Sequence, residues 1–552
     1  MKKTLLFAAL SLISLSAAAQ DTYENARMLG SDLNGTARYV GMGGALEALG
    51  ADISTISTNP AGIGMFRRSN VSLSFGVVNQ QDAVKFDNLG KTNLSFDQVG
   101  FVYSMRTGAS SYVNCAFNYH KSRNFDQVLS AANRFQHEAS MNKLAFAKGT
   151  LESDRNGGYF LDTNNKGEWM GWRDANSDER AYPYSQWDYM YTNVATIDDV
   201  NRPFLYDEDG FSPTYSIADN YLFDRAHRGW VADYDFNLSG NVNNRFFWGL
   251  TVGFHDVNYH GYSSYVENIL DINNNNRGSH ELVDERWIDA TGADVKFGAI
   301  FMPIEESPFR IGLSISTPTW YDVKSENAST LYNDTDPNYF NYGADKWKSS
   351  EIYEFKYYTP WKFGLSLGHT IDRYLALGLS YEYSSMGSAN TRIYNGHFSS
   401  YMDNEDTDPD RVMNDHTDRT LKGVSLLKAG VELKPDANLA IRLGYNYQTA
   451  MYNDNGVRDT RLDSPGVLYS STADYTNWKA TNRITCGLGY KWEGLSFDLA
   501  YQYSITNGTF YPFQGNVTYI DPADGLDYDC ISTPSDVNFK RHQLLFTIGY
   551  TF

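Results

Sequence analysis

The 552-residue chain is poor in cysteine and in positive charge, and it has no long hydrophobic run after its first residues. Three cysteines are too few for a disulfide framework or a cysteine-rich zinc site in a chain of this length. Lys and Arg number 46 against 66 Asp and Glu, a net charge of −20, which argues against a nucleic-acid-binding protein. No apolar run reaches the about 18 residues of a membrane-spanning helix, which excludes a helical membrane protein.

Aromatic residues are abundant, at 15% of the chain, and glycines number 45. Intrinsic disorder is excluded because disordered chains contain few aromatic residues. What remains is a large all-β protein.

The first residues predict export. Lys2 and Lys3 precede an apolar stretch over residues 5–15, and Ala17-Ala18-Ala19 offers the small residues that signal peptidase requires. We expect residues 1–19 to be a signal peptide that is cleaved after Ala19. The stretch is too short for a membrane anchor.

Hydrophobic residues then alternate with small or polar ones to the end of the chain, which is typical of β-strands. Residues 375–383, 439–447, 495–503 and 544–552 show the alternation most clearly, with Leu, Ile, Phe and Tyr on one face. A soluble sandwich would bury this face between two sheets, whereas an outer-membrane barrel would expose it to lipid. Tyr pairs at 381 and 383, 445 and 447, and 501 and 503 favour the barrel, because they resemble an aromatic girdle.

The pattern predicts about 14 strands, an even number as single-chain bacterial barrels have. Expected strands are residues 70–79, 94–105, 111–121, 229–242, 244–258, 289–303, 308–323, 351–371, 373–386, 419–434, 438–449, 479–493, 495–505 and 540–552. Short connections alternate with long ones, over residues 80–93, 122–228, 259–288, 324–350, 387–418, 450–478 and 506–539. This alternation is typical of periplasmic turns and extracellular loops. The fold class is therefore a transmembrane antiparallel β-barrel of the bacterial outer membrane, over residues 70–552.

The long loops carry much of the acidity. Asp403, Glu405, Asp406, Asp408 and Asp410 form one cluster, and carboxylates of this kind can bind Ca²⁺. Neither this cluster nor the polar run at 271–276 has the spacing of a defined calcium loop, so a solvated loop is the favoured interpretation. The loop aromatics at 169–191 could collect an apolar ligand, although a role in folding the loop is favoured. No metal site and no cofactor are predicted.

The cysteines are expected to be incidental. Cys115 and Cys486 fall in the apolar phase of two predicted strands and should face lipid, and Cys530 lies in the last loop. No disulfide is expected.

A barrel of this size has a lumen that must be filled to avoid a leak. The remaining segment, residues 20–69, is expected to form a helical hatch inside it. Glycines in this segment permit close backbone packing, Asp52 or Ser54 could cap a short helix, and Asn59-Pro60 is a turn signal. The characteristic residues are Ala37, Arg38, Gly41, Gly43, Gly44, Ala45, Asp52, Asn59, Pro60 and Ala61.

These residues resemble the N-terminal hatch of the FadL/TodX outer-membrane transporters of hydrophobic compounds. The resemblance implies a monomeric barrel that passes long-chain fatty acids or aromatic hydrocarbons without an energy source. Arg38 and Asp52 could anchor the hatch to lumen charges such as those of Arg310, Lys362, Glu382, Arg442 and Asp498. Residues 112–119 contain no Gly or Pro that would predict a lateral exit through the third strand, and no ligand contact is assigned.

Transport is the favoured function, with a hydrophobic small molecule and outer-membrane lipid as the only expected partners. The alternative is a barrel that does not transport and serves as a surface receptor, for example for haem, or as a secretion scaffold. Haem would need an axial ligand such as His255, His260 or His280. An enzyme is not expected: His120, Ser122 and His542 could take part in a phospholipase site, but no supporting motif accompanies them.

Overall fold

The computed structural model describes residues 21–145, 159–163, 169–173, 185–194, 216–270, 274–336, 346–398, 405–462, 464–514 and 530–552. The predicted signal peptide and the centres of several long loops lie outside this part of the chain. None of the helices within these ranges is long and apolar enough to cross a membrane.

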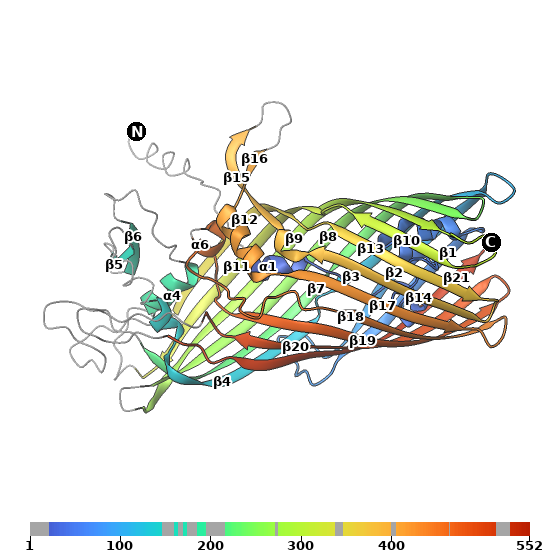
Figure 1. The fold of residues 1–552 in the computed structure, drawn as a ribbon. Helices are drawn as coiled ribbons and strands as arrows, with labels where there is room; N and C mark the ends of the chain where they lie inside the picture. Colours follow the sequence, from blue (N-terminus) through green and yellow to red (C-terminus); the bar gives the residue numbers. More distant parts are fainter. Residues whose placement is uncertain are drawn as a thin grey trace, which may run out of the picture.

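The described chain forms a closed antiparallel β-barrel of 14 strands, as predicted (Figure 1). The barrel closes because the last strand pairs with the first along its whole length, from Asn70 opposite Thr551 to Gln80 opposite Arg541. Four of the 14 are interrupted, so that one strand continues another. In order around the wall they are β1 (Asn70–Gln80), β2 (Thr92–Arg106), β3 (Tyr112–Asn124) with β4 (Gln127–Ala139), β7 (Ile217–Val242), β8 (Phe246–Leu270), β9 (Asn276–Phe301), β10 (Arg310–Ser316) with β11 (Trp320–Thr335), β13 (Lys362–Ile371) with β12 (Lys346–Tyr358), β14 (Leu375–Ser385) with β15 (Asn390–Phe398), β17 (Gly423–Leu433), β18 (Leu439–Gln448), β19 (Tyr475–Trp492), β20 (Leu495–Tyr511) and β21 (Ser535–Thr551).

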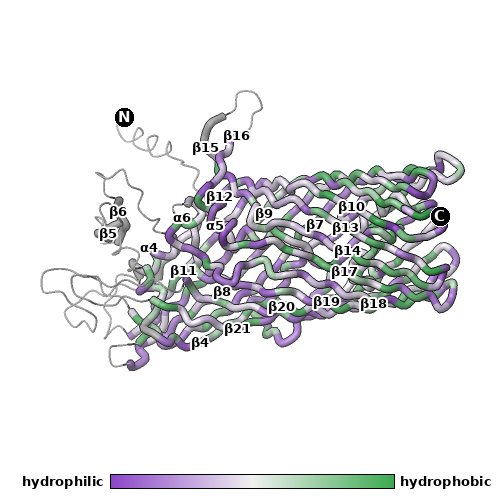
Figure 2. The backbone as a smooth tube through the Cα atoms, in the orientation of Figure 1, coloured by the Kyte–Doolittle hydropathy of each residue, from purple (hydrophilic) through white to green (hydrophobic). Residues whose placement is uncertain are grey.

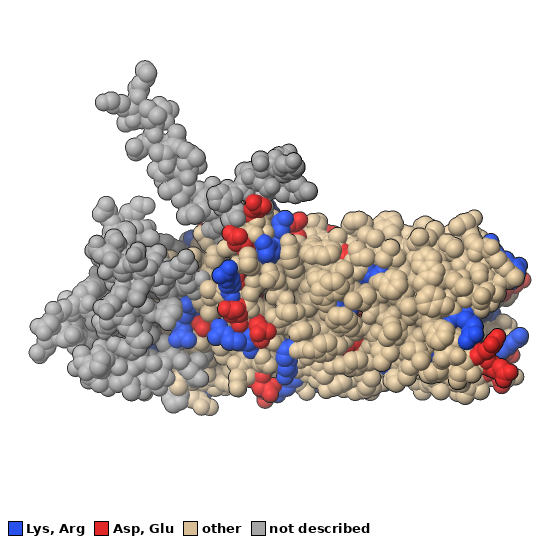
Figure 3. Space-filling model, turned by 45° about the horizontal axis from the view of Figure 1, so that its top comes forward, with Lys and Arg blue, Asp and Glu red and all other residues tan. Residues whose placement is uncertain are grey.

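The apolar face of each strand points outwards. Leu443 is 57% exposed and Leu379 is 44% exposed, whereas Arg442, which follows the opposite phase, is 4% exposed. Soluble proteins rarely expose a large contiguous apolar surface, so the alternative of a soluble sandwich is wrong. In Figure 3, on the face shown, charged residues gather near the loop end and at the opposite rim, and a belt with very few charges separates them. Figure 2 shows hydrophobic residues concentrated in the half of the wall farther from the long loops.

The two ends of the barrel differ in their connections. Short turns close one end, for example at Asn243 and Asn244, which both have a φ of 53°. Asn tolerates this left-handed conformation better than most residues, which suits a tight turn between long strands. The longer connections gather at the other end, where the helices α4 (Gln186–Val194), α5 (Arg411–Thr420) and α6 (Pro465–Leu468), the strand pair of β5 (Tyr159–Thr163) and β6 (Trp169–Arg173), and β16 (Glu405–Pro409), which pairs with β15, lie.

Three of the predicted long loops are wrong over much of their length, because the wall extends into them. β8 and β9 pair from Phe246 opposite Phe301 up to Leu270 opposite Asn276, across most of residues 259–288. β4 and the first half of β7 likewise pair inside residues 122–228, and β11 and β12 pair inside residues 324–350. The alternation fades there because the outward face of a wall that projects beyond the membrane can be polar, while backbone pairing needs no particular side chain.

Two expected strands, 308–323 and 351–371, are each two strands. The first breaks at residues 317–319 and the second at residues 359–361, so each break contains a proline, Pro318 or Pro360. Proline has no N–H for the ladder. As a result, β9 pairs with β11 over residues 278–293 and with β10 over residues 296–301.

Residues 21–66 run through the inside of the barrel rather than along its wall (Figure 1). They form five short helices and make backbone or side-chain contacts with strands all around the wall. The helices are α1 (Thr22–Asn25), η1 (Ala26–Met28), α2 (Ala37–Gly41), η2 (Ile53–Ser57) and η3 (Pro60–Met65).

The described loop aromatics fold the outer end. Trp187 and Tyr191 of α4 are fully buried in a cluster with Tyr221, Phe223 and Phe510. For Trp187 and Tyr191, a role in folding the loop is therefore the better interpretation than ligand collection. The side chains of residues 169–173 lie outside the described part.

Candidate functional site

The inner floor of the lumen is formed by residues 37–65, packed backbone to backbone against the wall. At Gly43, whose φ is 63°, a Cβ would lie 2.8 Å from the backbone nitrogen of Tyr445. Only glycine allows such an approach. Wall glycines that face this segment at similarly close range are Gly100, Gly249, Gly298, Gly368, Gly378, Gly430, Gly444 and Gly487.

The polar residues of the segment fix its short helices. Asp52 caps η2 by accepting from the backbone N–H of Ser54 at 3.0 Å, and it also accepts from the Thr36 hydroxyl at 2.8 Å. Asn59 caps η3 through the N–H of Ala61, and Pro60 occupies its first turn, where a missing N–H costs nothing. Burial raises the pKa of Asp52 above its usual value, against the opposing effects of Arg38 and these hydrogen bonds.

Buried ion pairs hold the segment to the wall. Arg38 Nε lies 3.2 Å from Glu432 Oε2, and the same carboxylate binds Arg442 at 2.7 Å. Arg442 also reaches Asp498 at 2.6 Å, so the charges alternate in sign. Two of the predicted lumen anchors, Arg442 and Asp498, therefore lie in this network.

A second pair supports the same floor, with Lys428 Nζ 2.5 Å from Glu47 and 3.8 Å from Glu382. Arg310 donates to the backbone oxygen of Leu49 at 2.7 Å. Lys362 lines a cavity above the floor, and the structure gives it no contact with residues 21–66.

Above the floor, residues 26–34, which comprise η1 and the irregular stretch after it, lie beside two cavities of about 220 and 110 Å³. The larger is rich in arginine and aromatic residues, although the protein as a whole is acidic. Its lining includes Tyr23, Arg27, Asp32, Arg123, Phe125, Arg225, Tyr259, Tyr452, Arg458, Asp474, Tyr475, Trp478, Lys479, Arg483, Phe539 and Arg541.

Three guanidinium groups in this cavity share one carboxylate. Arg541 donates to Asp32 at 3.1 Å, and both Arg123 and Arg483 are close enough to lower the pKa of the Asp32 carboxyl group. Burial alone would raise this pKa, but the three arginines outweigh burial and hold it below its usual value. The other partners of Arg483 are neutral, the side chains of Asn446 and Gln448. The three arginines and Asp32 together therefore carry an excess of two positive charges.

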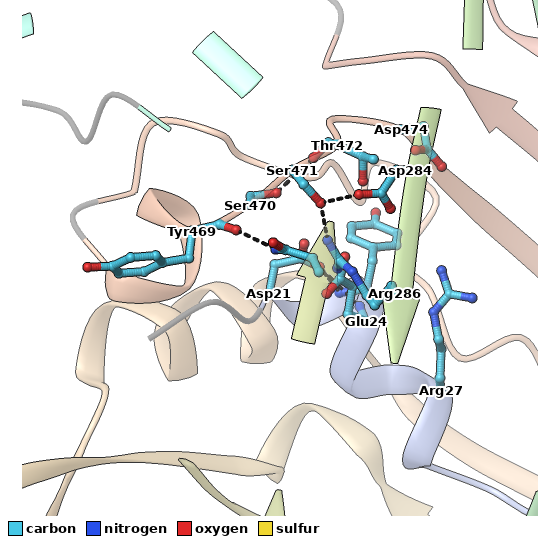
Figure 4. A network of polar contacts seen from close by, with 12 residues as sticks. Asp21, Glu24, Arg27, Asp284, Arg286, Tyr469, Ser470, Ser471, Thr472 and Asp474 are labelled. Carbon is cyan, nitrogen blue, oxygen red and sulfur yellow. Dashed lines mark hydrogen bonds and ion pairs between the residues drawn. The ribbon is translucent and has the colours of Figure 1, made fainter. Parts of the chain in front are cut away.

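A network of polar contacts, here called the roof, borders the cavity at Glu24, Arg458 and Asp474 (Figure 4). Asp21 and Glu24 both pair with Arg458, and Glu24 also pairs with Arg286. Arg286 in turn donates to Ser471 at 2.6 Å. The loop over residues 469–474 is thereby fastened to the start of the N-terminal segment.

The histidines predicted as alternatives are dispersed. His260 lies on the wall, stacked on Trp287 and 2.9 Å from Glu285, whereas His280 is buried near Tyr191. His255 faces the lumen between two carboxylates.

The residues considered for an enzyme do not form a nucleophile–base pair in the described structure. The Ser122 hydroxyl donates to Asp233 at 2.8 Å. His542 is on the outside of the barrel, where it bonds the Tyr501 hydroxyl at 2.7 Å. Cys115 and Cys486 are exposed on the wall as expected, and Cys530 is buried, where its thiol donates to the backbone oxygen of Ser140 at 3.4 Å.

The closed wall, its apolar belt and its polar lumen define a bacterial outer-membrane β-barrel, here with an internal N-terminal segment and a lumen cavity. No family model matches the chain, and no curated protein matches it in sequence. Among solved structures it is similar to a Pseudomonas aeruginosa FadL homologue, with 12% identity, coverage of 95% of this chain and 99% of the other, and a TM-score of 0.49. The Ralstonia pickettii toluene transporter TbuX has 12% identity, covers 94% and 99% of the two chains, and gives a TM-score of 0.43. The Pseudomonas putida toluene transporter TodX has 11% identity, covers 94% and 99%, and gives a TM-score of 0.45.

The arginines of the cavity were not among the residues selected from the sequence. Their signal was present, because Arg483 and Arg541 each occupy the small and polar phase of a strand whose other phase faces lipid. That phase shows that they face inwards. It does not show that strands far apart in the chain bring them to one carboxylate.

Proposed function

We propose that the protein is a passive outer-membrane transporter of hydrophobic small molecules, acting as a single barrel, and that residues 20–69 serve as its hatch. The observation that carries the proposal is the lumen cavity of about 220 Å³ between the roof and the floor. Aromatic side chains and an unbalanced group of arginines line it together. The resemblance of the glycine-rich segment to FadL/TodX hatches supports the same function.

The lining favours an apolar molecule with an anionic group, such as a long-chain fatty acid, over a neutral hydrocarbon. Each buried methylene contributes about 0.8 kcal/mol, and rings such as those of Tyr452 and Trp478 offer the apolar surface. A carboxylate among Arg123, Arg483 and Arg541 would reduce their excess charge and accept charge-assisted hydrogen bonds.

Uptake by this route needs no energy source if the concentration gradient points inwards. The floor blocks the lumen below the cavity, so release requires residues 37–65 to shift or the wall to open. Ligand in the cavity would touch residues 23–32 directly. The part of the N-terminal segment that leads into the floor is therefore part of the binding surface.

Binding tests the cavity. Purified protein in detergent is titrated with oleate and with oleyl alcohol, which differ in charge at the head group. Wild type should bind oleate more tightly, and Arg483→Gln should weaken oleate by about tenfold or more while changing the alcohol little, because one charge-assisted hydrogen bond is worth about 1.5–3 kcal/mol. Arg106→Gln, on an exposed turn, is the matched control.

Uptake tests transport. Cells with and without the protein are given labelled oleate, and the rate of entry is compared. Cells that contain the protein should take up oleate faster, and Arg483→Gln should reduce the gain. Equal uptake with and without the protein would remove the transport proposal even if oleate binds.

A barrel that only supports other proteins is the second candidate, because the floor consists of matched ion pairs such as Arg38 with Glu432. A scaffold would need the floor but not a positively charged cavity. Oleate binding that is lost in Arg483→Gln would count against this candidate.

A further inference from the structure

A cluster of ionisable side chains lies on the lumen side of β3, β7, β8 and β9, apart from the arginine cavity. It has more carboxylates than cations. The members are His120, Asp233, Asp235, His255, Asp294 and Lys296, and all are buried. Five of them, all except Asp235, line the smaller cavity of about 110 Å³.

The charges of the cluster do not balance. Lys296 Nζ lies 3.1 Å from Asp235 Oδ1 and 2.7 Å from Asp294 Oδ1. His255 places Nδ1 2.8 Å from Asp233 and Nε2 3.1 Å from Asp294, an arrangement that suits an imidazolium. Even with both of these groups charged, three carboxylates exceed two cations by one negative charge.

His120 lies beside the two carboxylates without a hydrogen bond to either. Its Nε2 is 3.6 Å from Asp233 Oδ2, and its Nδ1 is 3.7 Å from Asp235 Oδ2. Asp235 is fully buried, and its Oδ2 has no hydrogen-bond partner in the described structure. A buried carboxylate oxygen of this kind is costly unless something pairs with it.

One ligand atom from each of His120, Asp233 and Asp235 lies within 4.8 Å of the others. Zinc bonds to imidazole nitrogen and carboxylate oxygen are about 2.0–2.2 Å long, so two ligands of one tetrahedral ion lie about 3.3–3.6 Å apart. The 3.6 Å separation of His120 Nε2 from Asp233 Oδ2 is close to this range, whereas the 3.7 Å separation from Asp235 Oδ2 is measured from the other ring nitrogen, Nδ1. One ion binds only one of these nitrogens, so binding requires the imidazole to turn until that nitrogen faces both carboxylates.

We propose that His120, Asp233 and Asp235 bind a divalent transition-metal cation, represented by Zn²⁺, in the wall of the lumen. One imidazole and two carboxylates form a ligand set of the type that zinc accepts, and the smaller cavity leaves room for a water as fourth ligand. With its two positive charges the ion more than offsets the single excess negative charge, and it gives Asp235 Oδ2 a partner. Because His120 is on β3 and the carboxylates are on β7, it also ties together two strands next to residues 30–34.

The test is a zinc titration of the full-length protein after treatment with EDTA, followed by calorimetry near neutral pH. Wild type should bind one Zn²⁺, and His120→Gln and Asp235→Asn should each lower the affinity by about 100-fold or more. His260→Gln is the matched control, since His260 also lies beside a carboxylate but on a more exposed part of the wall. It should keep the wild-type affinity.

Location and folding are checked separately. Circular dichroism shows whether each variant retains the barrel, and anomalous scattering at the zinc edge from wild-type crystals should give a peak between β3 and β7. The proposal is overturned if folded wild type binds no Zn²⁺, if the peak lies elsewhere, or if His120→Gln and Asp235→Asn bind as wild type does.

Discussion

The floor and the cavity of the lumen are both built from buried charges, but they use them differently. In the floor, Glu432 lies between Arg38 and Arg442, and Arg442 continues to Asp498, so each charge has an opposite neighbour. In the cavity, three arginines surround the single carboxylate of Asp32. Matched charges fasten a segment in place, whereas unmatched ones leave binding capacity for a ligand of opposite sign.

The largest effect is expected from breaking the match in the floor. Glu432→Gln leaves the guanidinium groups of Arg38 and Arg442 without their shared partner. Removing one member of a buried ion network costs about 3–5 kcal/mol. Thermal and denaturant unfolding of the purified protein should show a loss of this size.

The control for this change is Glu305→Gln, in an exposed turn 3.7 Å from Arg245, where an ion pair contributes at most about 1 kcal/mol. If the two substitutions shift unfolding equally, the floor does not depend on its charges.

A smaller loss is expected when the floor keeps its charges but loses its close packing. Gly43→Val places a branched side chain at a φ of 63° and against the backbone of Tyr445. Strain and overpacking together should cost about 2–4 kcal/mol. A displaced floor should also raise the ion conductance of the barrel in planar lipid bilayers.

Gly90→Val is the comparison, because a Cβ at Gly90 meets nothing within 4 Å. Unchanged conductance in Gly43→Val, with the same channel behaviour as Gly90→Val, would show that residues 37–65 do not seal the lumen.

The smallest effect concerns Asp32, the carboxylate on which Arg541, Arg123 and Arg483 all act. Burial opposes its ionisation, but Arg541, Arg123 and Arg483 lower its folded-state pKa below the ordinary value of 3.8. The carboxylate therefore adds stability above pH 3.8, and this contribution is lost as the pH falls through the lowered pKa. Unfolding temperatures of wild type and Asp32→Asn, measured over this acidic range, should converge as the pH falls. Curves that stay parallel would show that Asp32 is not coupled to the arginines.

The wall could be predicted from the sequence to a large extent. Period-two alternation placed the outward face of strands such as β14 and β18 correctly, because lipid on one side and a lumen on the other impose that period on each strand by itself. The same reasoning failed for the loop-side parts of β8 and β9, where the outward face includes polar residues such as His260 and Asn268, and apolar residues such as Tyr265 and Leu282 face inwards. It also missed the breaks at Pro318 and Pro360, since neighbouring strands continue past them.

The interior could be predicted only in part. Asp52, one of two residues predicted to cap a short helix, does cap η2, because a cap acts on neighbouring backbone groups. Asn59, predicted with Pro60 as a turn that ends this helix, instead caps the next helix, η3. The role of residues 20–69 as a hatch stays a prediction. Arg123 comes hundreds of residues before Arg483 and Arg541, which lie on different strands, and no local pattern relates the three to Asp32. The same holds for His120 and Asp235.

The sequence by itself determined that the chain is a barrel with an outward apolar face and fourteen strands, because those properties are repeated in every strand and are read locally. The tertiary structure alone decided which inward charges meet. The closure and register of the wall place side chains from distant strands at the same level of the lumen. This placement pairs opposite charges in the floor and leaves an excess of positive charge in the cavity.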